Sequence, residues 1–368
     1  MNNAEYLIEL LKCAVTGSRI SEPDEDIDFE KIYEIAGKHN VQMTAYYGIK
    51  RLKYSLPAEA STKWENMHLH GISRSIRQLA ELQNICDTFA KRKIVHMPLK
   101  GSLIKHMYPS PDMRNMADMD ILIKPEDADR VYDIMLGMGY TCEMKGNCHH
   151  DVYKKEPIYN IEVHVSLFDE ADGMWDSYYK DVLDRTSAGR NEYERVLSHE
   201  DFYVYNIAHF AKHFQGGGSG IRSVMDIYIM NNAMPDMNMV YVYKQLEKLG
   251  LSDFYKKVTA LEKYWFEDGR FSEEIEETAK YVLSSGTYGT VYNSVKNEIK
   301  KNGRIKGFWL NVFPPLERMK FTFPFLKKMP VFLPFCWVAR WFFAIVTKPD
   351  KVLRKIRYVV RASREMEK

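Results

Sequence analysis

The spacing of hydrophobic and polar positions divides the chain into helical, mixed and again helical parts. Over residues 3–90, apolar side chains recur three and four positions apart, which predicts amphipathic helices. A long helix is expected from residue 60 to about residue 90. The helical spacing returns at Ser198, where a hydroxyl followed by acidic residues is typical of a helix start. A glycine-rich break at 216–220 then precedes another helix.

The middle of the chain has the spacing of β-strands. Short apolar or alternating runs predict strands over 94–99, 118–123, 150–155 and 158–168, the last two joined as a β-hairpin. A helix is expected to begin at Pro125 and to end near Gly139. We therefore predict an α+β fold with a small mixed-sheet core flanked by N-terminal and C-terminal helical regions. The expected parts are helices at 1–93, the core at 94–197, a helical region at 198–295 and a tail at 296–368.

Two aspartates stand at the start of the predicted strand 118–123. Asp118 and Asp120 are two positions apart, so their carboxylates should point to one face of the sheet. Two like charges about 5–6 Å apart repel by about 3 kcal/mol at an effective dielectric near 20, which predicts a cation between them. Carboxylate oxygens favour Mg²⁺ or Mn²⁺.

A third carboxylate follows on the strand 158–168. Glu162 and His164 should share one face, and if this strand lies beside the first, three carboxylates converge. Three carboxylates can hold two divalent ions, an arrangement suited to phosphoryl or nucleotidyl transfer. The simpler alternative is that Asp118 and Asp120 lie at a solvent-exposed strand end and bind no metal. Glycosyltransferases also use an Asp-x-Asp pair. That pair usually belongs to a larger parallel sheet, which the sequence pattern of this chain does not predict.

The order of these motifs resembles the DNA polymerase beta-type nucleotidyltransferase superfamily. Within it, the chain looks most similar to uncharacterised bacterial nucleotidyltransferases often found in polysaccharide-biosynthesis loci. The resemblance rests on Leu99-Lys100-Gly101-Ser102, then Arg114, then Asp118 to Ile123, then Ile161 to His164. It is strongest over 94–168 and continues weakly to about residue 230. The chain departs from the pattern in the fifteen residues between Ser102 and Asp118, and in having Glu as its third acid.

The resemblance implies a transfer of a nucleoside monophosphate from a nucleoside triphosphate, with ATP favoured, to an unknown acceptor hydroxyl in polysaccharide biosynthesis. Asp118, Asp120 and Glu162 would be the catalytic residues and would hold two Mg²⁺ or Mn²⁺ ions. Glu162 could also help to deprotonate the acceptor. The nucleotide would be bound by Lys100, Gly101, Ser102 and Arg114. Side chains near the acceptor or behind the ligands would be His150, His164, His213, Arg222 and Asp226, with His149 beside them.

Several of these residues have simpler interpretations. Arg222 and Asp226 are four apart, so a helix-surface pair is the default. His209 and His213 have metal-ligand spacing, but packing or substrate contact is favoured over zinc. Two other functions remain open for the whole chain: a non-catalytic nucleotide-binding module of the same fold, and a toxin–antitoxin-type enzyme that modifies protein or tRNA.

Charge and aromatic residues set the tail apart. From Lys296 onward there are 18 basic and 5 acidic residues, or +13, which leaves −11 for the preceding part of a chain whose net charge is +2. Residues 308–343 include twelve Phe or Trp. The apolar stretch 329–346 contains Arg340 and two prolines and is not expected to cross a membrane. We expect peripheral membrane contact, flanked by basic residues including those at 351–364, or packing on the acidic body. Nucleic acid is not an expected partner.

Cysteine usage indicates a reducing compartment. The five cysteines are scattered, odd in number and without a Cys-x-x-Cys pair, so neither a disulfide framework nor a zinc knuckle is predicted. They are Cys13, Cys86, Cys142, Cys148 and Cys336. The first residues have the pattern of an amphipathic helix rather than of a signal peptide. We expect a cytoplasmic protein, with its tail at the inner face of the membrane.

Overall fold

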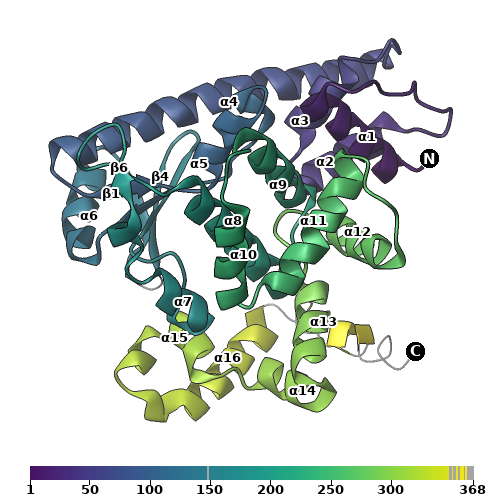
Figure 1. The fold of residues 1–368 in the computed structure, drawn as a ribbon. Coiled ribbons are helices and arrows are strands. Elements are labelled where there is room, and N and C mark those ends of the chain that lie inside the picture. The colour runs from purple at the N-terminus through teal and green to yellow at the C-terminus, as the bar shows by residue number, and fades with distance from the viewer. Residues whose placement is uncertain (147–148, 348–349, 351–353, 355–356, 360, 363–368) are drawn as a thin grey trace. The chain divides into compact units, whose positions relative to one another are not determined.

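The computed structural model describes residues 1–146, 149–347, 350, 354, 357–359 and 361–362. The chain forms two compact units, one of residues 1–211 with 220–287 and one of 212–219 with the described part of 288–368. In Figure 1 the colour runs from purple to green through the first unit and reaches yellow in the second. The four-part division expected from the sequence stays a prediction.

The first unit is an α+β fold, as predicted. Its helices are α1 (Asn3–Thr16), α2 (Phe29–His39), α3 (Gln42–Ile49), α4 (Ala58–Lys91), α5 (Gly101–Ile104), α6 (Ala128–Gly137), α7 (Met174–Tyr179), most of α8 (His199–Gly216), α9 (Ile221–Ala233), α10 (Met239–Lys248), α11 (Ser252–Phe266) and α12 (Glu273–Ser285). Its strands are β1 (His96–Pro98), β2 (Met119–Ile123), β3 (Thr141–Met144), β4 (His150–Lys155), β5 (Tyr159–His164), β6 (Ser187–Ala188) and β7 (Arg195–Val196). The expected long helix is α4, and the expected hairpin is β4 with β5.

Five strands form a mixed sheet in the order β1-β2-β5-β4-β3. The central strands β2 and β5 are parallel, and their register places Asp120 opposite Glu162. The other neighbouring strands in this sheet are antiparallel. The edge strand β3 was not predicted, because its four residues alternate between exposed and half-buried positions and carry little apolar signal.

One face of the sheet is covered by α4 and α6. The apolar side chains of β2 on this face are Met119, Ile121 and Ile123, which join a buried cluster with residues of both helices. Because side chains alternate along a strand, Asp120 lies on the opposite face. In β5, Ile161 and Val163 face the same cluster. The alternation of side chains therefore gives the sheet one apolar face and one face that holds the predicted site residues.

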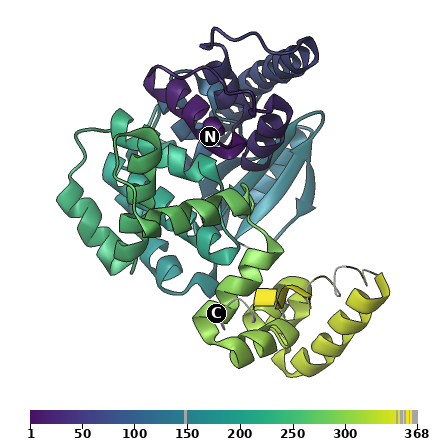
Figure 2. The ribbon, with the colours of Figure 1, turned by 90° about the vertical axis from the view of Figure 1, so that its right-hand side faces the viewer.

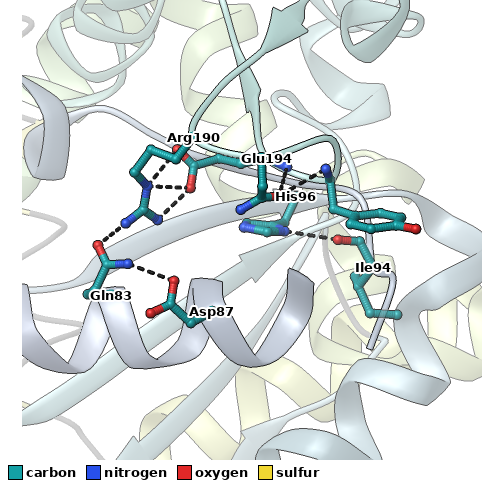
Figure 3. Close-up of polar contacts among 8 residues, drawn as sticks. Gln83, Asp87, Ile94, His96, Arg190 and Glu194 are labelled. Carbon is teal, nitrogen blue, oxygen red and sulfur yellow. Dashed lines mark hydrogen bonds and ion pairs between the residues drawn. The ribbon is translucent and has the colours of Figure 1, made fainter. Parts of the chain in front are cut away.

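A short hairpin formed by β6 and β7 lies against the outer side of β1 (Figure 3). The backbone N–H of His96 donates to the carbonyl of Tyr193 at 2.9 Å. Arg190 holds the hairpin by hydrogen bonds to the buried carboxylate of Glu194 and to Gln83 on α4 (Figure 3). The hairpin thus covers an edge strand that would otherwise expose unpaired backbone groups.

The later helices of the first unit gather beside the sheet, as the turned view in Figure 2 shows. The predicted start of α8 is confirmed, since the Ser198 hydroxyl accepts the Asp201 N–H at 3.1 Å. α9 packs against α5 and against α11. Within this helical layer, Glu262 of α11 is fully buried, and neither of its carboxylate oxygens has a hydrogen-bond partner among the described residues. This burial is costly for a charged side chain.

The second unit is helical and contains α13 (Val291–Asn302), α14 (Arg304–Val312), α15 (Leu316–Thr322) and α16 (Leu333–Thr347). Met319, Leu326 and Cys336 form a small buried cluster among α15, α16 and the turn between them. Across the described part of the chain, no helix is both long and apolar enough to span a membrane. Cys13, Cys86, Cys142 and Cys336 are free. Cys148 and most of the basic stretch 351–364 lie outside the described residues.

Candidate active site

Three predicted site residues meet at the centre of the sheet. The ligand atoms of Asp120, Glu162 and His164 all lie within 4.8 Å of one another. His164 Nε2 lies 2.8 Å from Asp120 Oδ1 and 3.6 Å from Glu162 Oε2. This meeting follows from the parallel register of β2 and β5, which sets Asp120 beside Glu162. Burial would raise the pKa of Glu162, but the adjacent His164 lowers it below its ordinary value.

Asp118 precedes β2 and is close enough to these residues to be affected by their charges. Burial, together with the carboxylates of Asp120 and Glu162, raises the pKa of Asp118 to about 6. Lys100 offers a positive charge in return, with its ammonium 2.9 Å from Asp120 Oδ1. Three carboxylates and one ammonium leave an excess of negative charge, so the donor set fits a hard divalent cation.

Lys100 precedes α5, which begins with Gly101 and Ser102, and hydrogen bonds hold this turn in place. Lys100 has φ = 46°, an uncommon value for a residue with a side chain. The Ser102 hydroxyl donates to the Leu99 carbonyl at 2.6 Å, and the Leu99 N–H donates to the Asp120 carbonyl at 3.0 Å. The turn is thereby fastened to β2. Strained backbone of this kind often marks functional sites.

Arg114 is buried and paired with a residue far along the chain. Its guanidinium donates from Nε and Nη2 to the two carboxylate oxygens of Asp226 on α9, each at 2.8 Å. The Tyr108 hydroxyl donates to the same carboxylate at 2.7 Å. Asp226 is therefore a buried partner of Arg114, while Arg222 donates to the Asn115 carbonyl at 3.2 Å. The pair joins α9 to the segment that leads into β2.

A model of a protein family described as uncharacterised nucleotidyltransferase matches residues 25–267. The chain belongs to this nucleotidyltransferase family. The match includes the whole five-stranded sheet, the Lys100 turn and Asp226. No curated protein and no solved structure matches the chain. Family membership supports nucleotidyl transfer in general and a nucleotide as substrate. The resemblance to the wider polymerase-beta superfamily and to polysaccharide-locus proteins stays a prediction.

The remaining predicted site residues occupy different places. His150 is opposite His164 in the β4–β5 pair, and its Nε2 lies 3.8 Å from Glu162 Oε2. Burial and the nearby His164 lower the pKa of His150 to about 4. His213 lies on α8 in the part assigned to the second unit. Among the described residues, the groups that could hold a metal include neither His209 nor His213.

Sequence reasoning missed Tyr205, whose phenol lies near Lys100. Tyr205 is fully buried on α8, and its phenol and the Lys100 ammonium affect each other electrostatically. Burial raises the pKa of Tyr205 above its ordinary value. Nothing in the sequence separates it from the other aromatic core residues of α8. Only the packing of α8 near the Lys100 turn reveals the contact.

Substitution of Gly101 should disturb the pairing of Arg114 with Asp226. A Cβ atom at Gly101 would lie 2.3 Å from Arg114 Nη1, and the guanidinium cannot retreat without losing Asp226. We expect Gly101→Ala to lower the free energy of unfolding by about 1–3 kcal/mol, as overpacking does. Chemical denaturation would measure it.

Gly137→Ala is the matched control, because a Cβ atom there meets nothing within 4 Å. The free energy of unfolding of Gly137→Ala should stay within about 1 kcal/mol of that of the natural protein. Equal stability of the two variants would show that Arg114 can move away from Gly101.

Proposed function

We propose that this protein transfers a nucleoside monophosphate from a nucleoside triphosphate, with ATP favoured, to an acceptor hydroxyl. Asp118, Asp120 and Glu162 would hold two Mg²⁺ or Mn²⁺ ions. The acceptor that the resemblance favours is a polysaccharide precursor or a related glycan in the cytoplasm. The observation that carries the proposal is the parallel register of β2 and β5, which sets Asp120 against Glu162 beside Lys100.

The proposed reaction is a substitution at the α-phosphorus. The acceptor oxygen forms a bond to this phosphorus, the bond to the bridging oxygen of the β-phosphate breaks, and pyrophosphate leaves. The hydroxyl gives up its proton to solvent water as the new bond forms. Bound divalent ions would supply charge neutralisation at the phosphates. The lowered pKa of Glu162 suits a metal ligand better than a proton acceptor.

The role of Lys100 follows from its pairing. Its ammonium balances part of the charge of Asp120. We propose that this ammonium turns toward the triphosphate when divalent ions take over the carboxylates. Arg114, in contrast, is held by two hydrogen bonds to the buried Asp226, so we assign it to positioning the segment before β2 rather than to phosphate contact.

Mass spectrometry after incubation with each nucleoside triphosphate, Mg²⁺ and a cell extract would test the proposal. We expect one class of extract molecule to gain the mass of a nucleoside monophosphate, with release of pyrophosphate. A labelled protein or tRNA in place of a glycan would identify the toxin–antitoxin-type alternative. Nucleotide binding by calorimetry without any transfer would favour the non-catalytic module, and no binding at all would exclude both.

We also propose that the second unit rests on an anionic membrane surface. α16 buries Cys336 in a local cluster, yet its other side exposes large apolar residues. These include Phe335 (71% exposed), Val338 (70%), Phe342 (65%) and Val346 (62%), spaced three or four positions apart. Lys327 and Lys328 are exposed just before this helix. An apolar helix face with adjacent lysines is typical of interfacial binding.

Vesicle flotation would test the membrane contact. We expect the natural protein to float with vesicles that contain anionic lipid, and the double variant Phe335→Ser with Phe342→Ser to lose most of that binding. The double variant Val240→Ser with Tyr243→Ser is a matched control, since both residues are exposed on α10. Equal flotation of the two double variants would contradict a role for α16.

A further inference from the structure

Three histidine rings gather beside the carboxylates of the sheet. One ring nitrogen from each of His149, His150 and His164 lies within 4.8 Å of the others. The ring centres are 4.6 Å apart for His149 and His150, 5.0 Å for His150 and His164, and 5.3 Å for His149 and His164. Three ring nitrogens this close can reach a single metal ion.

The fold builds this cluster from two strands. His150 of β4 and His164 of β5 are directly paired across the sheet. His149 comes just before β4, and its carbonyl accepts the Val165 N–H at 2.9 Å, which keeps its backbone beside β5. Because His149 lies outside the regular strand, strict alternation does not force its ring to the other face.

Each ring has one nitrogen turned toward a carboxylate. His149 Nδ1 lies 2.9 Å from Asp169 Oδ1, and His164 Nε2 lies 2.8 Å from Asp120 Oδ1. His150 Nε2 is 3.8 Å from Glu162 Oε2. Histidines that ligate a metal commonly donate their other N–H to a carboxylate, which fixes the ring and its tautomer.

The Nδ1 nitrogens of all three rings are unsatisfied. Nδ1 of His149, His150 and His164 are buried and make no hydrogen bond among the described residues, and His149 Nδ1 approaches Asp169 without hydrogen-bond geometry. His164 is only 2% exposed. Leaving such nitrogens without a partner is unfavourable, and a bound ligand would remove that cost.

We propose that His149, His150 and His164 bind a transition-metal ion of the Zn²⁺ type, at a site different in kind from the carboxylate site. Zn²⁺ holds imidazole nitrogens at about 2.0–2.1 Å in tetrahedral geometry, which sets the ring centres about 5 Å apart. Imidazole ligands suit Zn²⁺, Co²⁺ or Ni²⁺, whereas Mg²⁺ prefers oxygen. Three histidines leave a fourth position for water or a substrate atom.

A metal at this site would act on the carboxylates through His164. When Nδ1 of His164 binds the ion, Nε2 must carry the hydrogen and donate it to Asp120. The ion would therefore hold the His164 ring against the carboxylate that is paired with Lys100. Binding of this ion does not depend on the proposed nucleotidyl transfer.

Cobalt titration of the full-length protein would test the site. After treatment with EDTA and dialysis, we expect one equivalent of Co²⁺ to produce the visible absorption bands of four- or five-coordinate cobalt. One equivalent of Zn²⁺ should remove these bands, and millimolar Mg²⁺ should not. Absence of the bands, or their loss on addition of Mg²⁺, would overturn the proposal.

Substitutions of the proposed ligands would show where the ion binds. His149→Gln and His150→Gln should each lose the bands, and Asp169→Asn should weaken Co²⁺ binding by about 10- to 100-fold. His70→Gln, at an exposed position on α4, should bind like the natural protein. Circular dichroism would verify that each variant is folded. Unchanged bands in both His149→Gln and His150→Gln would refute the site, whatever the outcome of the nucleotide-transfer experiment.

Discussion

Asp120→Asn should reduce nucleotidyl transfer by about 10³-fold, equivalent to about 4 kcal/mol of activation free energy. Asp120 is central to the site, because its carboxylate contacts Lys100 and His164 and lies close to the carboxylate of Glu162. An amide cannot neutralise a divalent ion as a carboxylate does, and it presents a hydrogen-bond donor where an acceptor is needed. The rate of product labelling and the affinity for Mn²⁺ should fall together.

The fold should survive this substitution. Removing one of three neighbouring carboxylates relieves the repulsion that raises the pKa of Asp118. Asp129→Asn is a suitable control, because its carboxylate is 91% exposed on α6 and pairs only with the exposed Lys145 in the described contacts. Transfer by Asp120→Asn within threefold of the natural protein would remove Asp120 from the catalytic residues.

Glu262→Gln should stabilise the protein by about 3–5 kcal/mol at pH 9 and have little effect near pH 4. Burial, with a smaller contribution from Glu267, raises the pKa of Glu262 from 4.5 to about 8. Between these values the folded state keeps the proton while the unfolded state releases it. The stability of the natural protein should therefore fall as pH rises from 4.5 to 8 and level off above 8.

Chemical denaturation across this pH range would measure the effect. The natural protein and Glu262→Gln should diverge as pH rises, because the glutamine carries no charge in either state. Glu247→Gln provides a control, since Glu247 is exposed on α10. If the free energies of unfolding of the natural protein and of Glu262→Gln change in parallel with pH, Glu262 is already ionised in the folded protein.

Local patterns predicted the parts of the site that lie on strands. Alternation over 118–123 and 161–165 correctly set Asp120, Glu162 and His164 on one face, since strand geometry leaves few alternatives. The carboxylate pair also predicted a cation through simple repulsion, and that cation stays a prediction. What the pattern could not supply was the parallel pairing itself, which depends on the helices that cover the sheet.

Long-range contacts were beyond local patterns. Arg114 and Asp226 are 112 positions apart, and Asp226 also had a plausible partner four residues away in Arg222. The positive φ of Lys100 was equally hidden, because that residue type rarely adopts it. The edge strand β3 and the hairpin of β6 and β7 were missed because short polar strands are stabilised by their neighbours rather than by their composition.

The salt bridge between Arg114 and Asp226 limits how far the protein can be truncated. The sheet and its acidic residues end by His164, which invites excision of a minimal catalytic fragment. Such a fragment would lack α9 and would leave the guanidinium of Arg114 without its counter-ion. Breaking a buried pair in this way costs about 3–5 kcal/mol, a large share of a typical domain's stability. The sheet and the helices that follow it therefore have to be inherited, expressed and engineered as a single piece.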